Sequence, residues 1–361
     1  MFGTKGMASV LFTKLMDIRK VHRVGRSSLS VTLPYKWARR NALQAGDEIH
    51  VQEIDDNTLV ISSNDIGSGS GDLRTFEVGS DTSPDHLRRL LIGTYVTGAN
   101  HVRISAKKGE LRPAQLEALN GCVSRLTGFL VIKQTDDLFV IQNFMDPSAS
   151  LFSDHLNQLL SITQRMIRLS PQILSDEGGQ FSQKMITLGD QSDRLYYLTV
   201  RFLLLSLSDR ALLLDMGFDS TQEVVGGRLI AKGLEEICDR MEYLADLAIQ
   251  NDDTDWSFKK KQLKRAESQI ERICELLGAS VEGYFSGAVD LPEAALDELY
   301  SVQRESDAMI PKTGDTPGNI TAIQAVAFSS ISEAGRLTRM ISEVAMNNSL
   351  RRMRSNGENG K

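Results

Sequence analysis

The sequence contains few cysteines and few histidines, and neither type occurs at a spacing that binds zinc. Its three cysteines, Cys122, Cys238 and Cys274, lie far apart and form no C-x-x-C pair. The five histidines are scattered along the chain. A disulfide framework and a zinc site are therefore not expected, and the pattern fits a protein of the reducing cytoplasm.

Long apolar runs are also missing. The most apolar stretch, 195–207, is shorter than the about 18 residues of a membrane-spanning helix and is interrupted by Arg201. The first fifteen residues lack a continuous apolar segment and a clear cleavage site, so no signal peptide is expected. We interpret residues 1–16 as a leader, unless Met16 is the natural start.

Catalytic motifs are missing as well. The C-terminal half shows no hydrolase triad, no glycine-rich phosphate loop and no Cys/His metal set. Gly226 and Gly227 lie within a helical pattern and lack the Lys-Ser/Thr context of a phosphate-binding loop, so we predict that they serve helix packing. No enzymatic activity is predicted.

Charge is divided very unevenly along the chain. The net charge is −6, yet residues 1–40 carry nine Lys and Arg side chains and one acidic residue, Asp17. That segment is therefore strongly basic and the remainder strongly acidic. A compact basic segment on an acidic protein favours a polyanionic partner such as nucleic acid.

The order of strand, helix and linker patterns along the chain predicts a multidomain α+β protein. Residues 17–63 have the pattern of short strands and turns, and 64–71 form a Gly/Ser linker. Residues 72–146 predict a small α/β unit, with strands at 73–78 and 101–105, helices at 84–97 and 113–126, and a hairpin around Asp136 and Asp137. Nothing in the sequence of this unit assigns it a ligand.

Residues 153–350 have only helical patterns, and 351–361 are expected to be a tail. The predicted helices are 153–170, 182–214, 219–250, 257–285, 292–309 and 318–350, with breaks at signals such as Pro171 and Gly217. The segment DRLYYL, from Asp193, is similar to DELYSV, from Asp297. This internal similarity predicts two tandem three-helix bundles, which we call the helical body.

The basic segment has the features of a DNA-contacting surface. We predict contacts to phosphates or guanine edges from Arg19, Arg23 and Arg26, and phosphate neutralisation by Lys20 and Lys36. Gly25 allows a sharp turn between two strands. About 45 residues of short strands bury little core alone, so intertwining with a second copy is expected.

The same stretch resembles the SpoVT/AbrB family of swapped-hairpin DNA-binding domains. The resemblance rests on the strand IRKV, the turn GR, an apolar strand, a short helix ending in RR, the motif LQAGDEI and a closing hairpin. It implies a homodimeric β-barrel in which hairpins interleave, with DNA contacts from Arg19, Arg26, Arg39 and Arg40. Ser30 departs from the strand pattern of many members. Two alternatives remain, a simply solvated basic face and a domain that serves dimerisation alone.

Acidic residues four apart on predicted helices indicate a metal site. Glu235 and Asp239 share one helix face, and Asp190 and Asp193 flank the apolar face of another helix. The same spacing recurs at Glu242 with Asp246 and at Glu293 with Asp297. Such carboxylates suit a divalent or ferric ion, namely Mg, Mn or Fe. The alternative is that they are ordinary solvated surface.

The helical body resembles the PhoU family of phosphate-uptake regulators. The resemblance rests on SDRLYYLTVRF (192–202), LEEICDRMEYLADLAI (234–249) and the weaker SISEAGRLTRMISEVAMN (330–347). It implies repression of phosphate uptake and clusters of Mn, Fe or Zn held by E-x-x-x-D motifs. The first motif is Glu235 with Asp239, whereas Ser332 and Arg336 occupy the second, where Arg336 would repel a metal.

An AbrB-like domain joined to a PhoU-like body resembles an archaeal arrangement of phosphate regulators. The combination predicts a cytoplasmic, DNA-binding transcription regulator of phosphate homeostasis. The alternative is a signalling adaptor that acts on a phosphate transporter ATPase or a sensor kinase, with the basic domain as a dimer clamp. Metal storage or catalysis on the helical body is a third hypothesis.

Overall fold

A computed structural model describes residues 18–26, 28–55, 58–62, 73–175, 178–251, 258, 260–310 and 319–358. The chain divides into two compact units, 1–70 and 71–361, each described by itself below. This division falls within the predicted linker, 64–71. In the described part of the chain, no helix combines the length and apolar character needed to cross a membrane.

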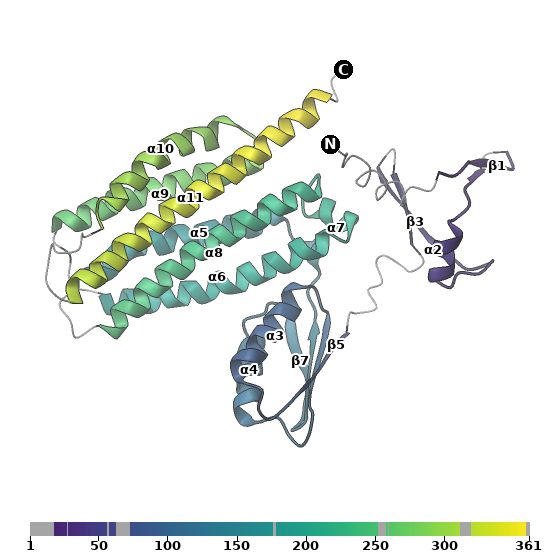
Figure 1. Ribbon diagram of the computed structural model, residues 1–361, viewed down its shortest axis with the longest axis horizontal. Coiled ribbons are helices and arrows are strands. Elements are labelled where there is room, and N and C mark those ends of the chain that lie inside the picture. The colour runs from purple at the N-terminus through teal and green to yellow at the C-terminus, as the bar shows by residue number, and fades with distance from the viewer. Residues whose placement is uncertain are drawn as a thin grey trace, which may run out of the picture. The chain divides into compact units, whose positions relative to one another are not determined.

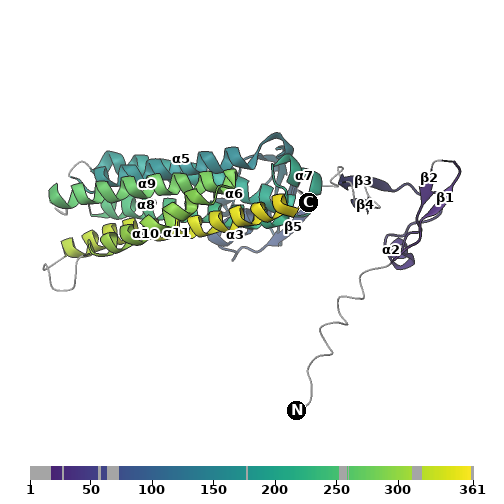
Figure 2. The ribbon, with the colours of Figure 1, turned by 90° about the horizontal axis from the view of Figure 1, so that it is seen from above.

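In its described residues the N-terminal unit forms two separate antiparallel hairpins and one short helix (Figures 1 and 2). Its elements are β1 (His22–Val24), β2 (Ser28–Ser30), α2 (Tyr35–Arg40), β3 (His50–Asp55) and β4 (Thr58–Ser62). Gly25 makes the turn between β1 and β2 with φ of +71°, as predicted. The predicted short helix that ends in two arginines is α2, and Ala42, two residues after its end, has a φ of +54°.

The next segment forms the predicted small α/β unit, a four-stranded sheet with two helices on one face (Figure 1). Its elements are β5 (Leu73–Val78), α3 (Pro84–Val96), β6 (His101–Ala106), α4 (Pro113–Val123), β7 (Phe129–Gln134) and β8 (Leu138–Asn143). The strand order is β5-β6-β8-β7, with β5 and β6 parallel and the other neighbours antiparallel. Its core joins Ile104 and Phe139 of the sheet to Leu87 and Leu119 of the helices.

The helical body contains α5 (Phe152–Ile173), α6 (Gly178–Ser206), α7 (Arg210–Asp215), α8 (Thr221–Gln250), α9 (Lys260–Ser286), α10 (Asp290–Asp307) and α11 (Asn319–Glu358). Helices α5, α6 and α8 pack as one set, and α9, α10 and α11 as a second (Figures 1 and 2). Contacts of α8 with α11 and of α5 with α9 join the two sets around one continuous core.

Several predicted helix ends were wrong. Pro171 lies inside α5 instead of ending it, and the hydroxyl of Ser170 donates to the Ile167 carbonyl that proline leaves without its usual donor (2.7 Å). The predicted helix 182–214 is interrupted before α7, because Asp209 caps a new helix by accepting from two backbone N–H groups. Helix α10 begins at Asp290, two residues before Pro292, since the first turn tolerates proline.

The predicted tail is helical over most of its length. Helix α11 runs to Glu358, and Arg351 and Arg352 both form ion pairs with Glu223 at the start of α8. Glu223 is buried, and these contacts hold the end of α11 against α8. The prediction for Gly227 is confirmed, because a Cβ there would stand 2.7 Å from the ring of Phe152.

A buried arginine connects the α/β unit to the helical body. Arg201 of α6 is 1% exposed. Its guanidinium donates to the backbone carbonyls of Tyr95 (2.6 Å) and Ala99 (2.9 Å), at the end of α3. It also donates to the Asn100 side-chain oxygen (2.7 Å) and stacks over the ring of Tyr95. A cation at the carbonyl end of a helix is electrostatically favourable, so this contact docks α3 on α6.

Candidate metal centre and nucleic-acid surface

Three carboxylates from two helices converge on one point of the helical body. One carboxylate oxygen from each of Asp193, Glu235 and Asp239 lies within 4.8 Å of the others. Glu235 and Asp239 occupy one face of α8, and the packing of α6 against α8 adds Asp193. We call these three residues the acidic cluster. Its donors are all hard oxygens, which suit Mg, Mn or Fe.

Burial makes the charged form of Glu235, the buried member of the acidic cluster, costly. Burial raises the pKa of the Glu235 carboxyl to about 7, and neighbouring Asp239 adds to that rise while Lys232 opposes it. The pKa values of Asp193 and Asp239 are raised as well, first by burial. A bound cation would stabilise the ionised carboxylates, so the cluster has the electrostatics of a cation site.

Lys232 already places one positive charge beside the acidic cluster. Its ammonium forms ion pairs with Glu235 and, at 2.6 Å, with Glu236. It also lies 5.6 Å from the centre of the Tyr196 ring. A metal ion at the cluster would therefore share Glu235 with Lys232 or displace the ammonium from it.

The fourth predicted ligand, Asp190, lies outside the acidic cluster. It forms an ion pair with Arg125, which follows the end of α4. Glu242 interacts electrostatically with the cluster: burial raises its pKa to about 7, and the charges of Asp193 and Asp239 contribute to that rise. The sequence placed Glu242 only with Asp246, although its position three residues after Asp239 also puts it on the same helix face.

The positions that correspond to the second motif contain no acidic pair. The Ser332 hydroxyl donates to Asp307 (2.5 Å) and accepts from the Gln303 amide (2.6 Å). Arg336 binds Glu333 through two guanidinium nitrogens. Glu293 and Asp297, the other predicted pair on this side, are exposed on α10.

The predicted DNA-contacting side chains are exposed on the N-terminal unit. They are Arg19, Lys20, Arg23, Arg26, Arg39 and Arg40. Arg23 lies in β1 opposite Leu29 of β2, whereas Arg39 and Arg40 end α2. A surface of this kind can neutralise the phosphates of a polyanion.

This unit has no buried side chain among those that the structure describes. Its apolar side chains are exposed instead, for example Ile18 at 94%, Tyr35 at 74% and Leu29 at 68%. A single copy of the unit therefore leaves apolar surface that a folded domain normally buries.

Comparison with known proteins identifies this same segment. Residues 23–66 match the family described as "Antidote-toxin recognition MazE, bacterial antitoxin". No curated protein matches the chain, and no solved structure does. The N-terminal domain is thus MazE/AbrB-like, which confirms the predicted domain type and fits a DNA-binding or antitoxin-type regulator.

Proposed function

We propose that this protein is a homodimeric, DNA-binding transcription regulator of phosphate-uptake genes that acts without enzymatic activity. The basic domain binds the operator, and the helical body is the sensing module. The observation that carries the proposal is the combination of a MazE/AbrB-like segment with six exposed basic side chains. Cytoplasmic location follows from this role.

Dimerisation of the basic domain is supported by the apolar surface that one copy exposes. This surface includes Val24 and Leu29 of the first hairpin and Val21 directly before it. It also includes Val51 and Leu59 of the second hairpin. Burying a side chain of this size contributes about 1.5–3 kcal/mol. We propose that a second copy covers these residues in a swapped-hairpin barrel, which doubles the basic surface and matches a two-fold operator.

Titration of the purified protein against promoter fragments of phosphate-transport genes tests the DNA-binding function, with scrambled duplex as competitor. We expect preferential binding whose logarithm falls with the logarithm of salt at a slope of about −5, for about six neutralised phosphates. Arg19→Ala with Arg26→Ala should abolish it. Arg89→Ala with Arg103→Ala, two exposed arginines of the α/β unit, is the matched control. Full affinity in the first double variant would contradict the assignment.

The phosphate connection is supported by the resemblance of the helical body to PhoU and by its acidic cluster. Both sets of three helices place the similar segments on corresponding helices, Asp193 on α6 and Asp297 on α10. We propose that the acidic cluster binds one Mn, Fe, Zn or Mg ion. Its carboxylate oxygens are suitable ligands, and a cation would stabilise the ionised form that the raised pKa values disfavour.

Calorimetric titration with Mn²⁺ tests the metal site. Glu235→Gln with Asp239→Asn should remove binding, because two of the three converging carboxylates are lost. Glu293→Gln with Asp297→Asn removes an exposed pair of the same spacing and should have no effect. Equal loss in both double variants, or less than one equivalent of bound metal in wild type, would contradict the site.

The match to an antitoxin family favours one second candidate, a regulator whose N-terminal domain recognises a toxin protein. A stable complex with a toxin, together with weak DNA binding that has no sequence preference, would favour this candidate over the DNA-binding regulator. A stable complex with a transporter ATPase or a sensor kinase, with no DNA preference, would instead support the adaptor hypothesis.

A further inference from the structure

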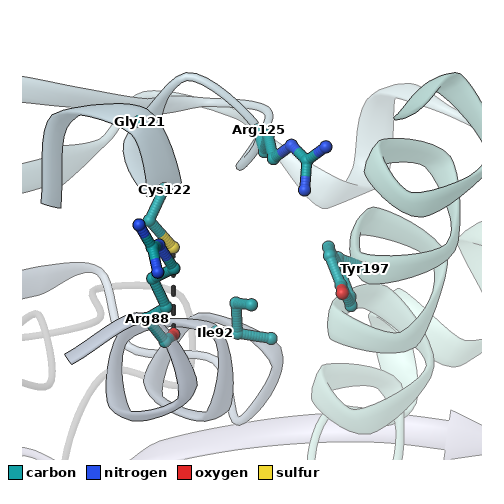
Figure 3. Close-up of a pocket in the computed structure, with 6 residues that line it drawn as sticks. All are labelled: Arg88, Ile92, Gly121, Cys122, Arg125 and Tyr197. Atoms are coloured by element: carbon teal, nitrogen blue, oxygen red, sulfur yellow. Dashed lines mark hydrogen bonds between the residues drawn. The ribbon is translucent and has the colours of Figure 1, made fainter. Parts of the chain in front are cut away.

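A small cavity lies where the α/β unit contacts the helical body. Its volume is about 250 Å³, and six residues from α3, α6 and the segment around the end of α4 line it: Arg88, Ile92, Gly121, Cys122, Arg125 and Tyr197. Figure 3 shows these residues around an open space, with Arg88 beside Cys122 on one side and Tyr197 on the other. No residue of the acidic cluster lines the cavity, but Asp193 lies one helical turn before Tyr197, and burial and then the charge of Asp193 raise the pKa of the Tyr197 hydroxyl.

The cavity combines two guanidinium groups with apolar walls. Arg88 pairs with Asp85 at 2.5 Å, and Arg125 pairs with Asp190. Both ion pairs are partly exposed, and such pairs contribute at most about 1 kcal/mol. A guanidinium carries several N–H donors in a planar fork, so each arginine can bind a ligand oxygen in addition to its present partner.

The walls of the cavity are held in place by contacts on either side of it. Asp190, Tyr197 and Arg201 lie on one face of α6, at intervals of seven and four residues. Asp190 and Arg201 both bind the α/β unit, through Arg125 and through the end of α3. Tyr197 stands between these two contacts, so the cavity is formed before a ligand enters, which lowers the entropic cost of binding.

We propose that this cavity binds a small organic anion, a phosphomonoester or a carboxylate with a compact apolar body. The anionic oxygens accept hydrogen bonds from Arg88 and Arg125, and the apolar body packs on Ile92 and the ring of Tyr197. Sites for larger ligands measure roughly 300–1,000 Å³, so this one suits a compact metabolite. Because the ligand contacts both the α/β unit and the helical body, its binding strengthens their docking.

Calorimetric titration of the full chain with three probes tests the ligand class. Phenyl phosphate and benzoate carry the expected anionic groups on a flat apolar body, and benzyl alcohol is a neutral analogue. We expect saturable binding of at least one anion and none of the alcohol. Arg88→Gln and Arg125→Gln should each weaken anion binding about tenfold or more, since each removes a charge-assisted hydrogen bond. Equal binding of all three probes, or of none, would overturn the proposal.

Gly121 allows a test that blocks the cavity without removing a charge. A Cβ at this position would meet no heavy atom within 4 Å, so Gly121→Leu extends into open space at the cavity. Gly93→Leu is the matched control, because Gly93 is also exposed in a helix, also has open space around its Cβ position, and does not line the cavity. Both variants should keep the wild-type melting temperature, and only Gly121→Leu should lose anion binding. Undiminished binding in Gly121→Leu would show that the anion binds elsewhere.

Discussion

Replacing Glu235 with Gln should remove one source of the pH dependence of the free energy of unfolding of the helical body. Burial raises the pKa of this carboxyl from its ordinary 4.5 to about 7. The neutral carboxyl is therefore the main form of Glu235 in the folded protein below about pH 7. At about 1.4 kcal/mol per pKa unit, ionising Glu235 costs the folded state roughly 3 kcal/mol.

The sign follows from proton binding. Between about pH 4.5 and pH 7 the folded state holds a proton on Glu235 that the unfolded state has released. The contribution of Glu235 to the free energy of unfolding is thus largest below pH 4.5 and is lost as pH rises through 7. From about pH 5 to pH 8 the loss is roughly 2.5 kcal/mol for this residue alone.

Urea unfolding of wild type and Glu235→Gln at both pH values, with a chelator present, measures this difference. We expect wild type to lose more stability than the variant by about that 2.5 kcal/mol. Glu242, whose pKa is also raised to about 7, is present in both proteins and therefore cancels in the comparison. Parallel pH dependence of the two proteins would refute the burial argument.

In wild type, Mn²⁺ should oppose the loss of stability that Glu235 causes as pH rises. The metal binds the ionised carboxylates, so its stabilisation grows as pH rises, and at a free concentration one hundred times Kd it reaches about 2.7 kcal/mol. Glu235→Gln should gain much less, because one of the three converging oxygens becomes an amide. Equal gains in the two proteins would place the metal elsewhere.

Two further predictions concern cations that the structure holds near these sites. Lys232→Met should raise the affinity for Mn²⁺ in calorimetry, because it removes the ammonium that pairs with Glu235; unchanged or weaker binding would mean that Lys232 does not compete with the metal. Arg201→Met should destabilise the docking of the α/β unit by about 3 kcal/mol or more, since it leaves the Gly98 and Ala99 carbonyls without their donor, each costing roughly 1–3 kcal/mol. Hydrogen exchange at the end of α3 should then accelerate more than exchange in α11, and unchanged protection there would contradict the role of Arg201.

Local features of the fold could be predicted because neighbouring residues determine them. The four strands of the α/β unit and the first residues of α3 and α4 follow from alternating apolar positions and from Pro84 and Pro113 at the helix starts. The spacing of Glu235 and Asp239 was enough to place them on one helix face. Helix ends were less predictable, because Pro171 depends on a hydroxyl partner and the end of α11 depends on Glu223 of α8.

The membership of the candidate metal site could be predicted only in part. Asp190 and Asp193 are three residues apart, which separates them by about 60° around α6. Asp193 therefore faces α8 and joins the acidic cluster, whereas Asp190 meets Arg125 of the α/β unit. Arg201 gave no sequence signal beyond a charge in an apolar run, since its partners are residues about a hundred positions earlier in the chain.

The sequence by itself determined the periodic helices and strands, the separation of a basic segment from an acidic remainder, and a domain type recognisable in residues 23–66. These properties depend on residue types and on short spacings. The tertiary structure alone decided which carboxylates converge, how far burial raises their pKa values, and that Arg88, Arg125 and Tyr197 share a cavity. Those properties depend on distances between helices and on exclusion of water, which exist only once the helices have packed.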